Sequence, residues 1–172
     1  MIAVKRVLYR DILDLKSKYS KNQKENYKFY KIIGTNIIYE FKNNGDELII
    51  KEYEVISKEK IKQDEEFEYY VSPGKLFCTS RYYNGLLHRT DGPAIIYEST
   101  YNPIYYIHGK LISERFYKKI MKNLKNGRIG NILERYKIYD LKLIRDIAEE
   151  QGTEKDLEKI DRQILISKLE NK

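Results

Sequence analysis

The spacing of apolar residues changes period along the chain. In residues 4–19 apolar side chains recur at intervals of three and four, which is typical of an amphipathic helix with one buried face. From residue 27 to residue 112 the pattern consists of short runs rich in β-branched and aromatic residues, separated by turn signals. The clearest signals are Asn44-Gly45 and Asn84-Gly85, because both residues of such a pair tolerate positive φ. This order predicts an N-terminal helix followed by an antiparallel β-meander.

The remainder, residues 113–172, has helical spacing. Ser113 is a good N-cap for a helix with Phe116, Ile120 and Leu124 on one side. A second helical region is predicted at 128–150, ended by Gly152. Thr153-Glu154-Lys155-Asp156 resembles a capping box for a last helix at about 154–169. The apolar stripe of that helix is narrow and fits a helical hairpin or an oligomer seam: Leu157, Ile160 and Ile164.

The predicted fold class is therefore α+β. It has an N-terminal helix at 1–26, an antiparallel β-meander with a hairpin repeat at 27–112, and a C-terminal helical bundle at 113–172. The stretch 57–66 is charged and is predicted to be a connector. Its acidic run, together with Glu68, is interpreted as a solvated loop and the start of a strand.

Composition narrows the class of protein. The chain has 172 residues, of which 41% are hydrophobic and 34% charged, as in globular proteins that fold in water. No apolar run reaches the ~18 residues of a membrane helix, and charged residues interrupt the N-terminal apolar pattern, unlike a signal peptide. The lone Cys78 cannot form an internal disulfide. We expect a cytoplasmic protein that does not enter a membrane.

Charge is concentrated in one segment. The net charge is +7, but residues 115–145 hold ten Lys or Arg against two acidic residues, so the rest of the chain sums to −1. On the helix predicted after Ser113, four of these cations lie away from the apolar side: Lys118, Lys119, Lys122 and Lys125. Such a stripe can contact phosphates or an acidic protein surface, and the plain alternative is a merely solvated helix. The candidate binding residues are Arg115, Lys118, Lys119, Lys122, Lys125 and Arg128.

The stretch "YYNGLLHRTDGPA" at 82–94 is the most distinctive in the chain. It resembles a repeat of phage, giant-virus and some bacterial proteins with the form aromatic-x-x-Gly-x-x-His-Arg-x-Asp-Gly-Pro-Ala. A degenerate copy at 106–112 aligns Tyr106, Gly109 and Leu111 with the start of the motif and then gives way to a helix. The matching residues are Tyr82, Gly85, His88, Arg89, Asp91, Gly92, Pro93 and Ala94.

This resemblance implies β-hairpins similar to MORN-type repeats, used as a rigid scaffold, and it implies no chemistry. His88, Arg89 and Asp91 are interpreted as a structural hydrogen-bond cluster in which Asp91 accepts from a neighbouring donor. The alternative for these residues is a binding or catalytic role.

Catalytic patterns are weak. His88 and Asp91 could form a hydrolase site with Cys78 or Ser80, and Asp91 could form a metal nuclease site with Glu98, but the usual spacings and partners are missing. Two histidines and one cysteine do not make a metal pattern, and no Gly-rich phosphate loop is present, so neither a metal nor a cofactor is expected. A helix-turn-helix around Gly152 fails because its apolar offsets do not match.

The sequence thus favours a non-enzymatic binding protein of phage or prophage type. One version, suggested by the family context, is an anti-CRISPR-like inhibitor that docks on a host defence nucleoprotein with an acidic surface and blocks it in the bacterial cytoplasm. The alternative is direct nucleic-acid binding through the basic helix. A third is a scaffold that forms homo-oligomers through its C-terminal helices.

Overall fold

The computed structural model describes residues 1–8, 10, 14, 16, 28–55, 60–100 and 102–170. The chain forms two compact units. The first, which we call the sheet unit, comprises residues 1–88 and 94–103. The second, the helical unit, comprises residues 89–93 and 104–172, so it includes part of the repeat motif as well as the C-terminal helices.

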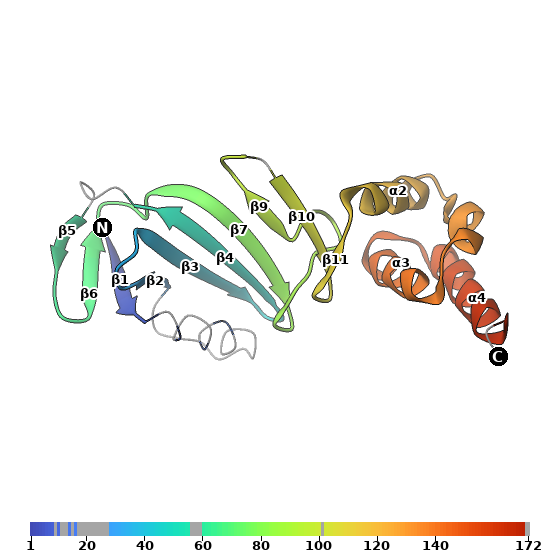
Figure 1. Ribbon diagram of the computed structural model, residues 1–172, viewed down its shortest axis with the longest axis horizontal. Helices are drawn as coiled ribbons and strands as arrows, with labels where there is room; N and C mark the ends of the chain where they lie inside the picture. The colour runs from blue at the N-terminus through green and yellow to red at the C-terminus, as the bar shows by residue number, and fades with distance from the viewer. Residues whose placement is uncertain are drawn as a thin grey trace. The chain divides into compact units, whose positions relative to one another are not determined.

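The sheet unit is built on one mixed sheet (Figure 1). Its strand order is β9-β7-β4-β3-β2-β1-β6-β5, with β8 also paired to β7. The β1–β2 pair is parallel, and the other pairs are antiparallel. The strands are β1 (Ile2–Val7), β2 (Phe29–Ile32), β3 (Ile37–Asn44), β4 (Glu47–Glu54), β5 (Lys60–Gln63), β6 (Phe67–Tyr70), β7 (Lys75–Tyr83), β8 (Leu86–Leu87) and β9 (Ile95–Tyr97).

The N-terminal segment is where the sequence prediction is wrong. Residues 2–7, assigned to a helix, form β1, which lies between β2 and β6 and buries Val4 completely. Over so few residues the spacing of Val4 and Val7 suits either structure, and β-branched side chains favour the strand. The rest of the predicted helix lies largely outside the described residues. A simple meander is also wrong, because β1 pairs with β6 across about 60 residues of chain.

One further expectation for the sheet unit changes, and another holds. The predicted connector at 57–66 contains β5, an exposed strand at Lys60–Gln63. The predicted turn signals hold: β3 and β4 are joined at Asn44-Gly45-Asp46, with Gly45 at a φ of 73°. Apolar residues fill the two faces of the sheet as separate clusters, one around Phe41 and Ile50 and the other around Val4 and Ile38.

The two copies of the hairpin repeat fold alike at their turns. Asn84-Gly85 has φ values of 48° and 78°, and His108-Gly109 has 47° and 75°. In both, the aromatic residue pairs across the hairpin with a leucine: Tyr82 with Leu87, and Tyr106 with Leu111. Positive φ at two consecutive turn residues is the geometry that matches the twist of a tight hairpin.

The helical unit packs one core against its own hairpin. Ser113 caps the first helix by accepting from the Phe116 amide, at 3.2 Å, as predicted. The second helical region differs from the prediction, since its first part, Ile129–Arg135, is a 3-10 segment followed by a separate helix. The elements are β10 (Asn102–Ile107), β11 (Lys110–Ile112), α2 (Glu114–Lys125), η2 (Ile129–Arg135), α3 (Ile138–Gln151) and α4 (Glu154–Glu170).

The ends of α3 and α4 follow the predicted signals. Gly152 ends α3, and its amide donates to the Ala148 carbonyl at 2.8 Å. At the start of α4 the Thr153 amide donates to the Asp156 carboxylate, at 3.2 Å, and the Asp156 amide donates to the Thr153 hydroxyl, at 3.3 Å. This reciprocal pair is a capping box. Among the described residues, no helix is long and apolar enough to cross a membrane.

Candidate basic site on the helical unit

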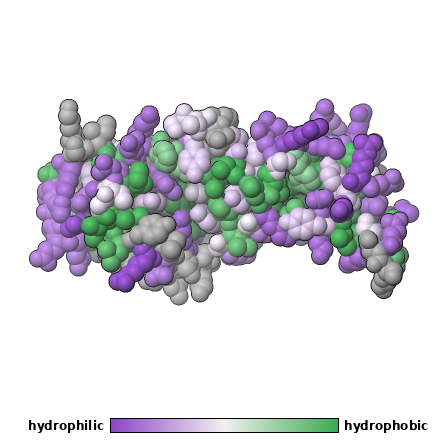
Figure 2. Space-filling model, viewed as in Figure 1, coloured by the Kyte–Doolittle hydropathy of each residue, from purple (hydrophilic) through white to green (hydrophobic). Residues whose placement is uncertain are grey.

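The cationic side chains predicted as a binding surface lie together on the exposed side of α2. Tyr117, Ile120 and Leu124 are buried in the core, so the opposite side of the helix faces solvent. Hydrophilic side chains dominate the visible surface over α2 (Figure 2). We call the exposed set, which includes Arg128 three residues beyond the end of α2, the basic face: Arg115, Lys118, Lys119, Lys122, Lys125 and Arg128.

Most of the positive charge on the basic face is not matched within the chain. Lys118 forms a salt bridge with Glu114 one turn earlier, at 2.7 Å, and the Lys119 ammonium lies 5.2 Å from the centre of the Tyr136 ring. The other four basic-face residues form no salt bridge with any residue that the structure describes. They are therefore available to an anionic partner without first breaking an ion pair.

A hollow of about 450 Å³ lies beside the basic face. Its wall on the α2 side includes Lys118, Lys122 and Lys125, one stripe of the helix, together with Met121. Asp91 of the repeat motif contributes to its lining as well. The two features singled out in the sequence, the basic helix and the repeat motif, thus meet at one place in the helical unit. The full lining is Asp91, Tyr117, Lys118, Met121, Lys122, Lys125 and Asn126.

Residues 89–93, which we call the motif turn, include Asp91, and the neighbouring Arg89 holds the Asp91 carboxylate in place. The Arg89 guanidinium donates to both Asp91 carboxylate oxygens, with Nη2 3.2 Å from Oδ2. Such a two-point contact fixes orientation as well as charge. Gly92 leaves room for it, because a Cβ atom there would lie 3.1 Å from the Arg89 guanidinium carbon. The predicted acceptor role of Asp91 is confirmed, with Arg89 as a donor.

Thr90, the second residue of the motif turn, connects it to two helices of the same unit, α2 and α3. Its side chain is 2% exposed, and its hydroxyl donates to the Glu150 carboxylate and accepts from the Gln151 amide at 3.3 Å. The Tyr117 hydroxyl donates to the Thr90 carbonyl at 2.8 Å. Burial, together with the negative charge of Asp91, raises the pKa of Tyr117 to about 12, so this hydroxyl keeps its proton at neutral pH.

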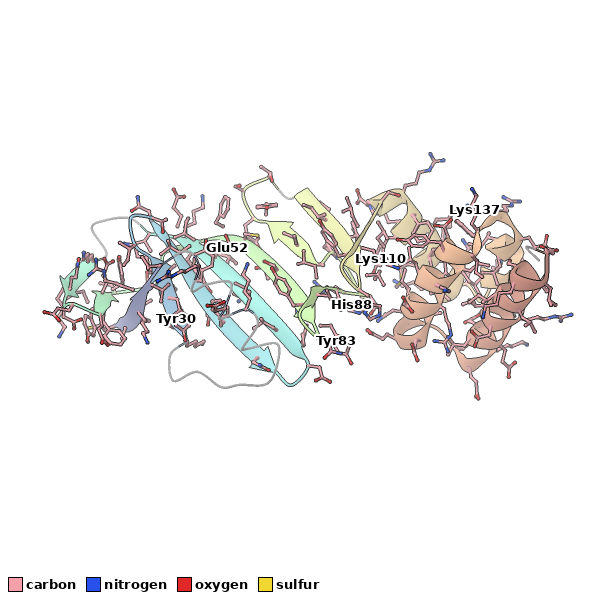
Figure 3. The ribbon with its side chains drawn as sticks, turned by 60° about the horizontal axis from the view of Figure 1, so that its bottom comes forward. Tyr30, Glu52, Tyr83, His88, Lys110 and Lys137 are labelled. Carbon is pink, nitrogen blue, oxygen red and sulfur yellow. The ribbon has the colours of Figure 1, made fainter. Side chains whose placement is uncertain are left out.

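His88 and Cys78, two of the residues considered for catalysis, are buried. His88 is 6% exposed; its amide donates to the Arg81 carbonyl at 3.1 Å, and its ring lies 5.5 Å from that of Tyr83 (Figure 3). In the second repeat copy the equivalent position is the buried Ile112, so both copies bury this side chain. Cys78 is buried as well, and burial, with the nearby charge of Glu52, raises the pKa of its thiol to about 11. A thiol with this pKa is a poor nucleophile at neutral pH.

The sheet unit holds a different arrangement of charge, around two buried carboxylates. Glu40 accepts from the Tyr53 hydroxyl at 2.7 Å and forms salt bridges with Lys28 at 2.7 Å and Lys42 at 3.6 Å. Burial alone would raise the pKa of Glu40, but the hydrogen bonds and positive charges of these partners lower it below its usual range.

Glu68 repeats this arrangement on β6. Its side chain is 8% exposed, accepts from the Tyr70 hydroxyl and pairs with Lys31 at 2.8 Å. Lys60 and Arg6 lie at 3.5 and 3.7 Å. Burial opposes ionisation here too, yet the hydrogen bonds from Lys31 and Tyr70 lower the pKa of Glu68. Glu68 lies at the start of a strand, as predicted, but the expectation that it is solvated is wrong, because its side chain is buried. Among the described residues no group of three or more His, Cys, Asp or Glu side chains could hold a metal ion.

The apolar residues of α4 divide between the core and the surface. Ile160 and Ile164, two positions of the predicted oligomer seam, are buried in the core of the helical unit, and Leu157 packs against that core. These three side chains therefore form the inner side of a helical hairpin with α3. The exposed apolar residues of α4 are Leu165, Ile166 and Leu169.

Sequence reasoning missed Thr90 and Tyr117, since their contact depends on a turn and a helix 27 residues apart. A scan against protein-family models and searches of curated proteins and of solved structures gave no match to this chain. The likeness of residues 82–94 to the hairpin repeat stays a prediction.

Proposed function

We propose that this chain is a binding protein, and not an enzyme, whose basic face docks on nucleic acid, either alone or within a nucleoprotein. The observation that carries the proposal is the set of six exposed cations on α2 and just beyond its end, of which four form neither a salt bridge nor a cation–π contact with any described residue. Unmatched cations on a rigid helix contact a phosphate backbone and release its counterions, which favours association.

The test is fluorescence anisotropy with short single- and double-stranded RNA and DNA. If about four cations contact phosphates, affinity for a single strand falls by about 50-fold between about 50 and about 200 mM salt. Charge reversal of Lys118, Lys119 and Lys122 should abolish most of this binding and flatten the salt dependence. A control variant reverses Lys142, Lys155 and Lys168, which are exposed on α3 and α4.

The outcomes separate the partners. Loss of binding in the α2 variant, with retention in the control, supports nucleic acid as the partner. Equal loss in both variants would show that only net charge matters. Absence of binding at low salt would reject nucleic acid and leave an acidic protein surface for the basic face.

The resemblance of residues 82–94 to phage and related proteins favours one version of this proposal. In it the chain docks on a host defence nucleoprotein and blocks nucleic-acid entry or activation, as an anti-CRISPR protein does. A purified protein that bound no such complex, and left nuclease interference intact, would reject this version without touching the broader proposal.

A further inference from the structure

The hollow beside α2 combines two kinds of polar group that a plain phosphate site would not need together. Lys122 and Lys125 lie in the last turn of the helix, and Asn126 follows it. The Asp91 carboxylate lines the same hollow, and 58% of its side chain is exposed. A ligand that fills this space meets cations and a hydrogen-bond acceptor at once.

The charges of the hollow leave a small positive surplus. The Arg89 guanidinium matches Asp91, and Glu114 matches Lys118. Lys122 and Lys125 are the two lining cations that form no salt bridge within the described residues. Since they lie three residues apart on one helix face, they can contact the same phosphate or two neighbouring ones.

The position of Asp91 is fixed by contacts that do not involve a ligand. Arg89 holds the carboxylate at two points, and the Tyr117 hydroxyl holds the neighbouring Thr90 carbonyl. An acceptor that is already oriented loses little conformational entropy when it binds a donor. It also repels a ligand that offers only negative charge.

We propose that this hollow binds one nucleotide of a single-stranded nucleic acid. Lys122 and Lys125 hold phosphate, Met121 contacts the base, and Asp91 accepts a hydrogen bond from an amino, imino or hydroxyl donor of the base or sugar. The volume of about 450 Å³ lies within the range of roughly 300–1,000 Å³ typical of small-molecule sites. A base in a duplex is stacked and paired, so an unpaired nucleotide is the form that can enter. This inference rests on the proposed function and adds a ligand unit and a specificity residue to it.

The first test compares two ligands with the variant Asp91→Asn. Replacing one carboxylate oxygen by an amide group, which donates where the ligand also donates, should weaken binding of a short single-stranded oligonucleotide by about 5-fold. Loss of a like charge should strengthen binding of inorganic polyphosphate by about 3-fold. Effects of opposite sign support the proposal. An increase for both ligands, or no change for either, overturns it, because Asp91 would then be only a negative charge near the basic face.

A second test needs no substitution and therefore holds even if Asp91→Asn fails to fold. The chain has two methionines, Met1 and Met121, so ¹³C-methyl labelling gives a probe in the hollow and an internal control. A nucleoside monophosphate or an oligonucleotide should shift the Met121 signal through the ring current of the base, whereas inorganic phosphate should not. An unmoved Met121 signal, with an oligonucleotide that binds by anisotropy, overturns the proposal.

Two further experiments distinguish a backbone phosphate from a terminal phosphate, and the nucleotide site from the basic face as a whole. The affinity of Lys122→Ala is measured for oligonucleotides with and without a 5′-phosphate. An equal loss of affinity for both oligonucleotides assigns a backbone phosphate to the hollow. A loss only for the oligonucleotide with the 5′-phosphate assigns the terminal phosphate to it. Charge reversal at Arg115, Lys119 and Arg128, outside the lining of the hollow, tests the proposed function alone. Binding that depends on these three residues and not on Asp91 or Met121 rejects the nucleotide site and keeps the basic face.

Discussion

The two units of this protein use lysine and arginine in opposite ways. In the sheet unit, five cations surround two buried carboxylates, Glu40 and Glu68, whose pKa values are lowered. In the helical unit, the basic face is exposed, and five of its six cations form no salt bridge within the described residues. A buried charge needs an opposite charge or hydrogen-bond partners in the folded chain, because it has lost its water. An exposed charge is solvated and can remain unpaired until a partner molecule binds. The difference indicates that cations stabilise the first unit, and the proposed function gives those of the second a role in recognition.

The largest expected effect tests the structural half of this comparison. Glu68→Gln leaves the nearby Lys31, Lys60 and Arg6 without their shared carboxylate, so we expect the free energy of unfolding to fall by about 2–4 kcal/mol. Urea denaturation measures the loss, and hydrogen exchange should locate it in β1, β2 and β6.

The matched control is Glu66→Gln, because Glu66 lies two residues away and is exposed. It should change the free energy of unfolding by less than about 0.5 kcal/mol. Equal effects of the two substitutions would mean that the cluster around Glu68 does not stabilise the fold, and the comparison between the units would fail on this side.

A second prediction uses pH. Because the folded-state pKa values of Glu40 and Glu68 lie below those of the unfolded chain, their stabilisation is present above the unfolded value of about 4.3. It is lost as the pH falls from there through the folded-state pKa. We expect the sheet unit to lose exchange protection in this window, and Glu68→Gln to reduce the pH dependence. A sheet unit as stable at pH 3 as at pH 7 would contradict the prediction.

Whether a structural feature could be predicted from the sequence depended on how far apart along the chain its contacting residues lie. Ser113, Gly152 and Thr153 act through residues within four positions, and their caps were predicted correctly. The strand β1 could not be placed, because its partner β6 is about 60 residues away and six residues do not distinguish strand from helix. Glu68 offered a signal that was missed, since alternation in "FEYY" puts Glu68 and Tyr70 on one face.

The candidate site also has one part that the sequence could predict and one part that it could not. The exposure of the basic face follows from helical spacing in one segment, so the sequence was sufficient to predict it. The approach of the motif turn to α2 was not predictable, because Thr90 and Tyr117 are joined by a single long-range hydrogen bond. The residues that shape the hollow therefore appeared only with the fold.

A smaller effect concerns this connection. Thr90→Val removes a buried hydroxyl that bonds Glu150 and Gln151 while keeping the shape of the side chain. We expect the helical unit to lose about 1 kcal/mol of stability, measured by urea denaturation. The control Thr100→Val alters an exposed threonine and should be neutral. Oligonucleotide affinity should also fall for Thr90→Val, because the motif turn carries Asp91; unchanged stability and affinity would refute the role given to Thr90.

The smallest expected effect on stability is at the basic face, and it completes the comparison. The double variant Lys122→Ala, Lys125→Ala should change the free energy of unfolding by less than about 0.5 kcal/mol at about 0.15 M salt, where attraction to the helix C-terminus is screened. The same variant should weaken binding of a single-stranded oligonucleotide and reduce its salt dependence. In the sheet unit Lys31→Met should do the reverse, lowering stability and sparing binding, since the Lys31 side chain is 13% exposed and bonded to Glu68 and Tyr70. If removing the two α2 lysines destabilised the fold by more than about 1 kcal/mol, the basic face would be structural too, and exposed charge would not distinguish the two units.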